Sequence, residues 1–362
     1  CTIEIPPRTY TQTTTISLPL VSYSYIYKLK CEYGATLHYT GSNYAINIAA
    51  GGVVITDCQL AGTGKAAGGI QLDGTQWVSL NNLRISEFSR GDAIYNHGTN
   101  TVSIRDSALF HNRNGIHAAY NGTVGQSIAM TIIGTTIWSN SGWGVYEETA
   151  TRSYPNCSNI YIGDVIQYNG TNGVSGSGQV FIQGGYSTRF QDDYFEQDGK
   201  NTHDCTIQIG DSTHTAHAPL ITANFFNSHG VRSTICNAAS QGAVITNNFE
   251  NAHATNLIDQ GSSSAGTIVL GNEGNYASLS TSYAGFRFHG DSVMQSCGTA
   301  TFRSSTTSSN AVCGFIPAHC TFSGSNPPAS LADLYYSISG KNVSLTSSTR
   351  GSGSFTVACS PE

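Results

Sequence analysis

The sequence predicts an all-β fold, a single-stranded right-handed parallel β-helix followed by a small C-terminal antiparallel β module. Short β-branched segments recur about 22 to 31 residues apart, and an Asn/Gly-rich turn follows each one. This spacing is too short for βαβ units and has no helical period, but it suits two or three strands per coil. A solenoid of such coils is expected to carry its function on an outer face.

The β-helix is predicted over residues 1–296. Its entry coils occupy residues 1 to about 50, and the repeat is clearest in three segments that begin at Val78, Val102 and Met130. Two later copies, residues 220–229 and 244–253, match nearly residue for residue. The steps from Phe195 to Phe226 (31 residues) and from Phe226 to Phe249 (23 residues) predict one interior stack of three rings.

The C-terminal module is predicted over residues 297–362. There the repeat gives way to Ser/Thr-rich strands with hairpin signals, which would cover the open edge of the last coil. Ten cysteines without a Cys-x-x-Cys pair predict disulfides, and therefore a secreted, extracellular protein. The expected pairs are Cys31 with Cys58, Cys205 with Cys236, Cys297 with Cys359, and Cys313 with Cys320.

Composition and missing motifs exclude several functions. Only 16 Lys and Arg stand against 22 Asp and Glu, so no basic patch for nucleic acid is expected. No apolar run approaches the ~20 residues of a membrane span. A phosphate-binding loop, a Gly-x-Ser-x-Gly elbow and a His-Glu-x-x-His helix are all missing from the sequence.

Three segments of the entry coils resemble the pectate-lyase-like β-helix superfamily. They are Ile5-Pro-Pro-Arg-Thr-Tyr, Thr13-Thr-Thr-Ile and Ala35-Thr-Leu-His-Tyr-Thr-Gly, with Arg8 where the superfamily pattern has Gly. The resemblance covers roughly residues 1–290 and implies a β-helix with a polysaccharide partner. It implies no single chemistry, because the superfamily includes lyases, glycoside hydrolases, esterases and phage tailspikes. The polygalacturonase, pectin esterase and pectate lyase signatures are missing, so no specific family is assigned.

Aligning the coils predicts a first candidate site. One outward column holds Tyr95, His117 and Tyr146, and the next holds His97 and Glu148. The inward positions on this alignment are Ile94, Ile116, Val145 and Val174. A band of aromatic and polar side chains is typical of a sugar-binding groove, so the Tyr and His residues are predicted to bind substrate and Glu148 to act with His117. The alternative is a solvated sheet face.

A second candidate site contains Glu196 and Glu250. If Phe195 and Phe249 point inward, these carboxylates point outward two rungs apart, about 9.6 Å, near the upper end of the ~6.5 to 9.5 Å used by inverting glycosidases. They would then act as general acid and general base, unless this face too is merely solvated. The residues expected to tune their pKa values or hold the substrate are Asp192, Tyr194, His229 and His253. A neighbouring column, Asp193, Asn224 and Asn247, is predicted to be a structural turn ladder.

These features favour a secreted polysaccharide-degrading enzyme that cleaves glycosidic bonds by hydrolysis, without a cofactor or metal. One alternative is a polysaccharide lyase acting by β-elimination on a uronate-containing glycan, which would add Ca²⁺ as a cofactor. Another is a non-catalytic glycan-binding protein or surface adhesin. A phage tailspike is disfavoured because tail proteins assemble in a reducing cytoplasm, where ten cysteines would not form disulfides.

Overall fold

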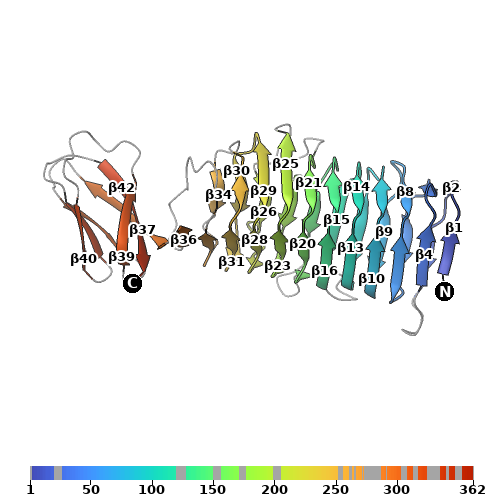
Figure 1. The fold of residues 1–362 in the computed structure, drawn as a ribbon, viewed down its shortest axis with the longest axis horizontal. Helices are drawn as coiled ribbons and strands as arrows, with labels where there is room; N and C mark the ends of the chain where they lie inside the picture. The colour runs from blue at the N-terminus through green and yellow to red at the C-terminus, as the bar shows by residue number, and fades with distance from the viewer. Residues whose placement is uncertain are drawn as a thin grey trace.

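A computed structural model shows the chain as a solenoid of short strands wound around one axis (Figure 1). The described residues are 2–19, 27–119, 128–149, 156–170, 177–198, 205–251, 256–260, 263–264, 266–270, 272, 287–290, 292–302, 308–312, 317–323, 335–339, 342–346 and 353–361. Every regular element among them is a strand, and three parallel sheets form the faces of the coil. The predicted all-β, right-handed parallel β-helix is confirmed.

In chain order a coil contributes to sheet A, then sheet B, then sheet C; among the described residues, the first six coils place one strand in sheet A, and the next four place two short ones there. In the described chain, sheet B contains β2 (Thr9–Gln12), β5 (Thr36–Tyr39), β8 (Gln59–Ala61), β11 (Arg84–Ser86), β14 (Ala108–Phe110), β17 (Thr136–Trp138), β21 (Val165–Gln167), β25 (Tyr194–Asp198), β29 (Phe225–His229) and β33 (Phe249–Glu250). Sheet C contains β3 (Ile16–Leu18), β6 (Tyr44–Ile48), β9 (Gly68–Asp73), β12 (Asp92–His97), β15 (Asn114–Ala119), β18 (Val145–Glu147), β22 (Val180–Ile182), β26 (Cys205–Ile209), β30 (Ser233–Asn237) and β34 (Asn256–Gln260).

Sheet A runs the length of the solenoid. Its parallel strands are β1 (Thr2–Ile5), β4 (Tyr27–Cys31), β7 (Val53–Thr56), β10 (Gln76–Asn81), β13 (Asn100–Arg105), β16 (Ile128–Ile133), β19 (Asn156–Cys157), β20 (Ile160–Ile162), β23 (Gly185–Tyr186), β24 (Arg189–Gln191), β27 (Ala216–His217), β28 (Leu220–Thr222), β31 (Ser240–Gln241), β32 (Val244–Thr246), β35 (Ile268–Leu270) and β36 (Arg287–Gly290).

Beyond β36 the pairing becomes antiparallel. Strands β37 (Ser292–Phe302), β39 (Pro317–Ser323) and β42 (Gly353–Pro361) extend sheet A, and β38 (Ser308–Val312), β40 (Tyr335–Ser339) and β41 (Asn342–Thr346) form a further sheet. These strands lie beyond the last coils (Figure 1). The predicted boundary between residues 296 and 297 falls inside β37, and the division into domains stays a prediction.

Aligned apolar residues fill the interior, because side chains alternate along a strand and successive rungs superpose. On sheet C the register aligns Ile94, Ile116, Val145 and Val180, and none of them has exposed area. Burying each such side chain contributes about 1.5–3 kcal/mol. The predicted inward residue Val174 is not in this column, because β18 pairs with β22; residue 174 itself lies outside the described residues.

A buried ladder of polar side chains follows the corner between sheets A and B. Asn224 Oδ1 accepts the backbone N–H of Asp193 at 2.9 Å, and Asn248 Oδ1 accepts that of Asn224 at 3.0 Å. Asn224 Nδ2 also donates to the carbonyl of Phe190 at 3.1 Å. The predicted turn ladder is therefore present at Asp193 and Asn224. Its third member is Asn248, because Asn247 is an exposed turn residue with a left-handed φ of 55°.

The interior ring stack is one ring shorter than the sequence predicts, because it ends at Phe226 and does not include Phe249. Phe195 and Phe226 are fully buried, with ring centroids 4.8 Å apart. Strand β33 pairs with β29 so that Phe249 lies opposite Phe225, a step of 24 residues, and Glu250 lies opposite Phe226. Phe249 is therefore 42% exposed and Glu250 is 2% exposed. The outward orientation predicted for Glu250 is wrong, because a one-residue slip in register exchanges the two faces of a strand.

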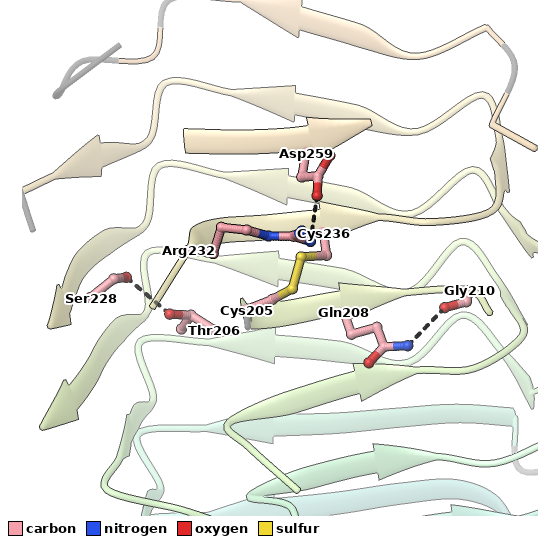
Figure 2. Close-up of a disulfide and its surroundings, with 8 residues drawn as sticks. All are labelled: Cys205, Thr206, Gln208, Gly210, Ser228, Arg232, Cys236 and Asp259. Carbon is pink, nitrogen blue, oxygen red and sulfur yellow. Dashed lines mark hydrogen bonds and ion pairs between the residues drawn. A yellow bond between two sulfur atoms is a disulfide. The ribbon is translucent and has the colours of Figure 1, made fainter. Parts of the chain in front are cut away.

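Two disulfides link adjacent coils in the described residues. They join Cys31 to Cys58 and Cys205 to Cys236, as predicted from spacings of 27 and 31 residues. Figure 2 shows the second bridge between β26 and β30, and beside it an ion pair of 2.6 Å between Arg232, the residue before β30, and Asp259 on β34. The other two predicted pairs involve Cys297, Cys313, Cys320 and Cys359, whose side chains lie outside the described part of the chain.

Candidate functional site

The outer face of sheet C carries the first predicted column. The register aligns Tyr95 on β12 with His117 on β15, and His117 with Tyr146 on β18. Phe181 on β22 continues the column. Because the preceding residue on each strand is a buried Ile or Val, strand alternation turns all four rings outward. The sequence prediction of this column is confirmed as geometry, with Phe181 as a member that it missed.

The rings of this column contact one another in series: Tyr146 stacks on His117 and on Phe181, and the rings of Tyr95 and His117 are tilted by 43°. Centroid distances are 4.8 Å from Tyr95 to His117, 4.8 Å from His117 to Tyr146, and 5.5 Å from Tyr146 to Phe181. Tyr44 extends the stack to Tyr95, at 5.8 Å, across the intervening coil. Gly68 on that coil makes this contact feasible, because a Cβ there would lie 2.2 Å from the Tyr44 ring. The ring faces thus cover each other, and the ring edges remain for contact with a ligand.

His117 is held between two carboxylates. Its Nδ1 lies 3.0 Å from Asp92 Oδ2, and its Nε2 lies 2.8 Å from Glu148 Oε2. Asn114 donates to the other Asp92 oxygen at 2.7 Å. Asp92 is buried, whereas the Glu148 side chain is 42% exposed. Hydrogen bonds therefore link the buried Asp92 carboxylate through the His117 imidazole to the solvent-exposed Glu148 carboxylate. We call this series the acid–imidazole–acid chain.

This arrangement determines the charge on each group. Burial alone would lower the pKa of His117, but the hydrogen bonds to Asp92 and Glu148, together with their charges, raise it to about 9. The hydrogen bond from His117 is also the main reason that the pKa of Glu148 is lowered, with further contributions from the charges of His117, Arg113 and His214. At neutral pH the pair is an imidazolium and a carboxylate.

We expect the imidazole of His117 to titrate near pH 9 in a proton NMR titration, and at a lower pH in a Glu148→Gln variant, which removes one of the two negative partners. Because the folded-state pKa lies above the unfolded value of 6.5, the associated stability is present below pH 6.5 and is lost as the pH rises to about 9. Titration near 6.5 in both proteins would contradict the proposed charge state.

Polar groups extend the site along the axis in both directions. On one side, His97 Nδ1 lies 2.9 Å from Asp73 Oδ1, and the His97 ring stacks on Tyr95 at 5.2 Å. On the other side, the Tyr146 hydroxyl lies 3.4 Å from Gln183 Oε1, and Gln183 Nε2 donates to Asp211 at 3.1 Å. The candidate site therefore spans the coils from β9 to the end of β26.

The second predicted site does not come together. Glu196 lies on the outer face of sheet B, where the Tyr194 hydroxyl and Asn227 Nδ2 donate to it at 3.1 and 3.3 Å. Glu250 lies inside the solenoid, where it accepts hydrogen bonds from Thr234 and from the backbone of Ser228. The two carboxylates therefore point to opposite sides of sheet B and cannot flank one glycosidic bond.

The remaining members of that prediction are dispersed. Asp192 is an exposed residue at the corner between sheets A and B, with a left-handed φ of 57°. His229 ends β29 on sheet B, and residue 253 lies outside the described residues. In the described part of the chain, no group of three or more His, Cys, Asp or Glu is placed to hold a metal ion. No helix found there is long and apolar enough to cross a membrane.

Sequence reasoning missed Asp92, Asn114 and Tyr44. The signal for the first two was available, since Asp92 and Asn114 open equivalent strands and pair in register. Tyr44 was overlooked because its ring reaches past a glycine coil, a contact that alignment by adjacent rungs does not reveal.

Comparisons with solved structures agree on the fold. The tailspike of Escherichia coli bacteriophage HK620, in complex with a pentasaccharide, superposes with a TM-score of 0.58 at 10% identity, covering 100% of this chain and 74% of that one. Tailspike gp49 of Acinetobacter baumannii bacteriophage Fri1, a capsular polysaccharide depolymerase, gives 0.54 at 10% identity, with 99% and 78% covered. PfbA, a surface adhesin of Streptococcus pneumoniae, gives 0.50 at 10% identity, with 79% and 81% covered.

The fold that this chain shares with these structures is the parallel β-helix. No protein-family model and no curated protein matches the sequence. At these identities the likeness shows the β-helix alone and does not transfer chemistry. Catalytic groups on a β-helix must therefore be argued from this chain's own residues, of which the Asp92–His117–Glu148 chain is the most organised.

Proposed function

We propose that the protein is a secreted polysaccharide-binding protein that lays a glycan chain along sheet C and hydrolyses a glycosidic bond beside Glu148. The observation that carries this proposal is the hydrogen bond between the exposed Glu148 carboxylate and His117, at the centre of a tyrosine-edged face. Tyrosine hydroxyls, imidazoles and amides along several coils suit the hydroxyl groups of an extended sugar chain. Two disulfides support an oxidising, extracellular location.

Hydrolysis fits the charge state better than β-elimination does. An ionised Glu148 can take a proton from the attacking water as a general base and then return it to the leaving oxygen, while the hydrogen bond from His117 keeps the resting carboxylate ionised. A lyase needs a base that removes a proton from carbon. His117 is protonated and bonded at both nitrogens, and burial is the largest of the effects that raise the pKa values of Tyr95 and Tyr146 to about 12, so all three are poor bases at neutral pH.

A second candidate is glycan binding without cleavage. Glycosidases commonly use a second carboxylic acid with a raised pKa. Among the described carboxyl groups the raised pKa values belong to Glu147, Asp164 and Asp193, and burial is the largest cause for all three. These groups lie inside the solenoid, away from the face of sheet C, which favours a binding module.

A panel of polysaccharides distinguishes these functions. The protein is incubated with each glycan, and new reducing ends are measured together with the ultraviolet absorbance of unsaturated uronate products. We expect reducing ends without the absorbance, which indicates hydrolysis. Both signals together would instead identify a lyase. Retention on a glycan affinity gel with neither signal would identify the binding module, and no retention by any glycan would contradict glycan recognition altogether.

A further inference from the structure

The candidate site is one continuous strip of polar and aromatic edges along sheet C. We call it the sheet C strip; its members are Asp73, Tyr95, His97, His117, Tyr146, Glu148, Gln183 and Asp211. Hydrogen bonds and ring contacts connect these residues in the order Asp73, His97, Tyr95, His117, Tyr146, Gln183 and Asp211, and Glu148 joins the series at His117. Five steps of about 4.8 Å separate its ends, so the strip is about 24 Å long, enough for several sugar units.

Carboxylates dominate the charge of this strip. Three of them, Asp73, Glu148 and Asp211, belong to the strip, and Asp92 lies directly behind His117. The positive charges that act on Glu148 from the described residues are His117, Arg113 and His214. His117 is already bonded to two carboxylates, and His214 to Asp211 at 3.0 Å.

The positive side chains of the neighbouring turns do not reverse this balance. Lys65, Arg90 and Arg113 are exposed on the turns that lead from sheet B to sheet C, where Glu87 is also exposed. They lie at the edge of the strip, whereas the carboxylates lie along it. The whole chain is negative as well, with a formal charge of −6.

The tyrosines of the strip respond to this negative potential. Burial is the largest cause of the raised pKa of Tyr95, and the charges of Glu148, Asp92 and Asp73 raise it further. Tyr146 behaves in the same way, with burial first and then Glu148 and Asp211. Two hydroxyls on different coils thus experience an excess of negative charge, although Arg113 opposes it at Tyr146.

A ligand with acidic groups would meet repulsion along this strip. Two like charges 4 Å apart cost about 1 kcal/mol even at the dielectric constant of water, and more near a protein wall. A uronate, sulfate or phosphate ester would have to approach Asp73, Glu148 or Asp211 without a free Lys or Arg among the strip members. Hydroxyl and ammonium groups, in contrast, donate hydrogen bonds to carboxylates.

We infer that the sheet C strip takes glycans without acidic groups and binds those that carry free amino groups most tightly. This inference rests on the proposed function, because it assigns the charge class of the glycan to the same site. The reason is the excess of carboxylates along the strip, whose histidines are themselves bonded to carboxylates; Arg113 offsets part of this negative charge. The ammonium groups of amino sugars are attracted by Glu148 and Asp211, neutral sugars experience neither attraction nor repulsion from these charges, and the carboxylates of uronates are repelled.

The test compares three oligosaccharides of equal length by isothermal titration calorimetry at low and high ionic strength. The probes are a glucosamine oligomer, its N-acetylated neutral counterpart and an oligogalacturonate. We expect the glucosamine oligomer to bind at least about fivefold more tightly than the neutral one at low salt, and the oligogalacturonate at least about fivefold more weakly. Added salt should reduce both differences in affinity, because salt screens the charges of the strip and of the oligomers. An oligogalacturonate that binds as tightly as the neutral oligomer overturns the inference.

A pair of double variants separates the strip from the overall charge. Asp73→Asn with Asp211→Asn should narrow the affinity ratio between the glucosamine and neutral oligomers. The matched control is Asp57→Asn with Asp106→Asn, which changes the same number of charges on turns between sheets A and B and should keep the wild-type ratio. An equal narrowing in both overturns the inference. Binding of none of the three oligomers contradicts the proposed function, and this inference with it.

Discussion

Replacing Glu148 by Gln is expected to lower the rate of glycan cleavage by about 10²- to 10⁴-fold, the usual contribution of a general acid–base group. The change keeps the size of the side chain and removes the charge that both activates water and balances His117. The measurement is the release of reducing ends from the glycan that the panel identifies, with kcat and KM determined separately. A loss confined to kcat indicates a role in the chemical step, and a loss confined to KM indicates binding.

Glu87 provides a matched control for this variant. Its carboxylate also pairs with a histidine of the next coil, since His111 Nδ1 lies 3.0 Å from Glu87 Oε1, and both side chains are more than half exposed. Glu87 lies outside the sheet C strip, so Glu87→Gln should retain the wild-type rate. If the Glu148→Gln variant cleaves the glycan at the wild-type rate, Glu148 has no role in the chemical step. Equal losses in the two variants would point to a general effect of surface charge.

The free energy of unfolding is expected to fall as the pH rises from about 4 to about 7, and Asp164→Asn is expected to remove part of that fall. Burial raises the pKa of Asp164 from 3.8 to about 7. The folded state therefore holds a proton that the unfolded state releases, and the stability present below pH 4 is lost as the pH approaches 7. Three pKa units correspond to about 4 kcal/mol. Urea denaturation at several pH values measures the effect.

The asparagine ladder explains why an Asn side chain at position 164 should stabilise the fold more than the native Asp does near neutral pH. Backbone N–H groups donate to Asp164 Oδ1 and Asp193 Oδ1 at 2.7 and 2.8 Å, while the Oδ2 atom of each is buried without a partner. In the same ladder Asn224 and Asn248 donate from Nδ2 to a backbone carbonyl at 3.1 and 3.0 Å. An amide at position 164 is expected to make that bond at every pH.

Asp57→Asn serves as the control for this prediction, because Asp57 lies on the solvent side of the same corner. It should leave the pH dependence of unfolding as in the wild type. Asp193, whose pKa is raised by burial and then by Asp164, still titrates in the single variant, so the double Asn variant should have the flattest profile. Identical profiles for wild type and Asp164→Asn would show that this carboxyl does not carry the effect.

Much of the fold was predictable because a solenoid repeats one local rule. Equivalent residues of successive coils lie side by side, so a sequence alignment of coils is also a map of contacts. That rule correctly placed Tyr95, His117 and Tyr146 in one column and paired Cys31 with Cys58. It worked wherever apolar inward residues set the register.

The prediction was wrong where a polar residue is buried. The near-identical segments 220–229 and 244–253 align Phe225 with Phe249 and would place Glu250 inside, as the structure does. The prediction instead aligned Phe226 with Phe249, one residue away, because a buried glutamate is unusual in an apolar interior. Thr234 and Ser228, which lie on other strands, donate hydrogen bonds to that carboxyl. The sequence around Glu250 does not reveal such distant partners. The acid–imidazole–acid chain was missed in part for the same reason. Its geometry depends on side-chain directions across three coils.

The two disulfides also determine how this molecule can come apart. A coil packs mainly on the coil before it and the coil after it, so a solenoid normally loses its terminal turns first and separates progressively inward. Cys31–Cys58 closes two coils near the N-terminal end, and Cys205–Cys236 closes two coils near the end of the described repeats. The coils that carry the sheet C strip extend from the coil of Cys58 to the coil of Cys205, so each closure includes one end of the strip. In an oxidising environment they are protected from progressive loss at both ends, and a reducing environment removes that protection.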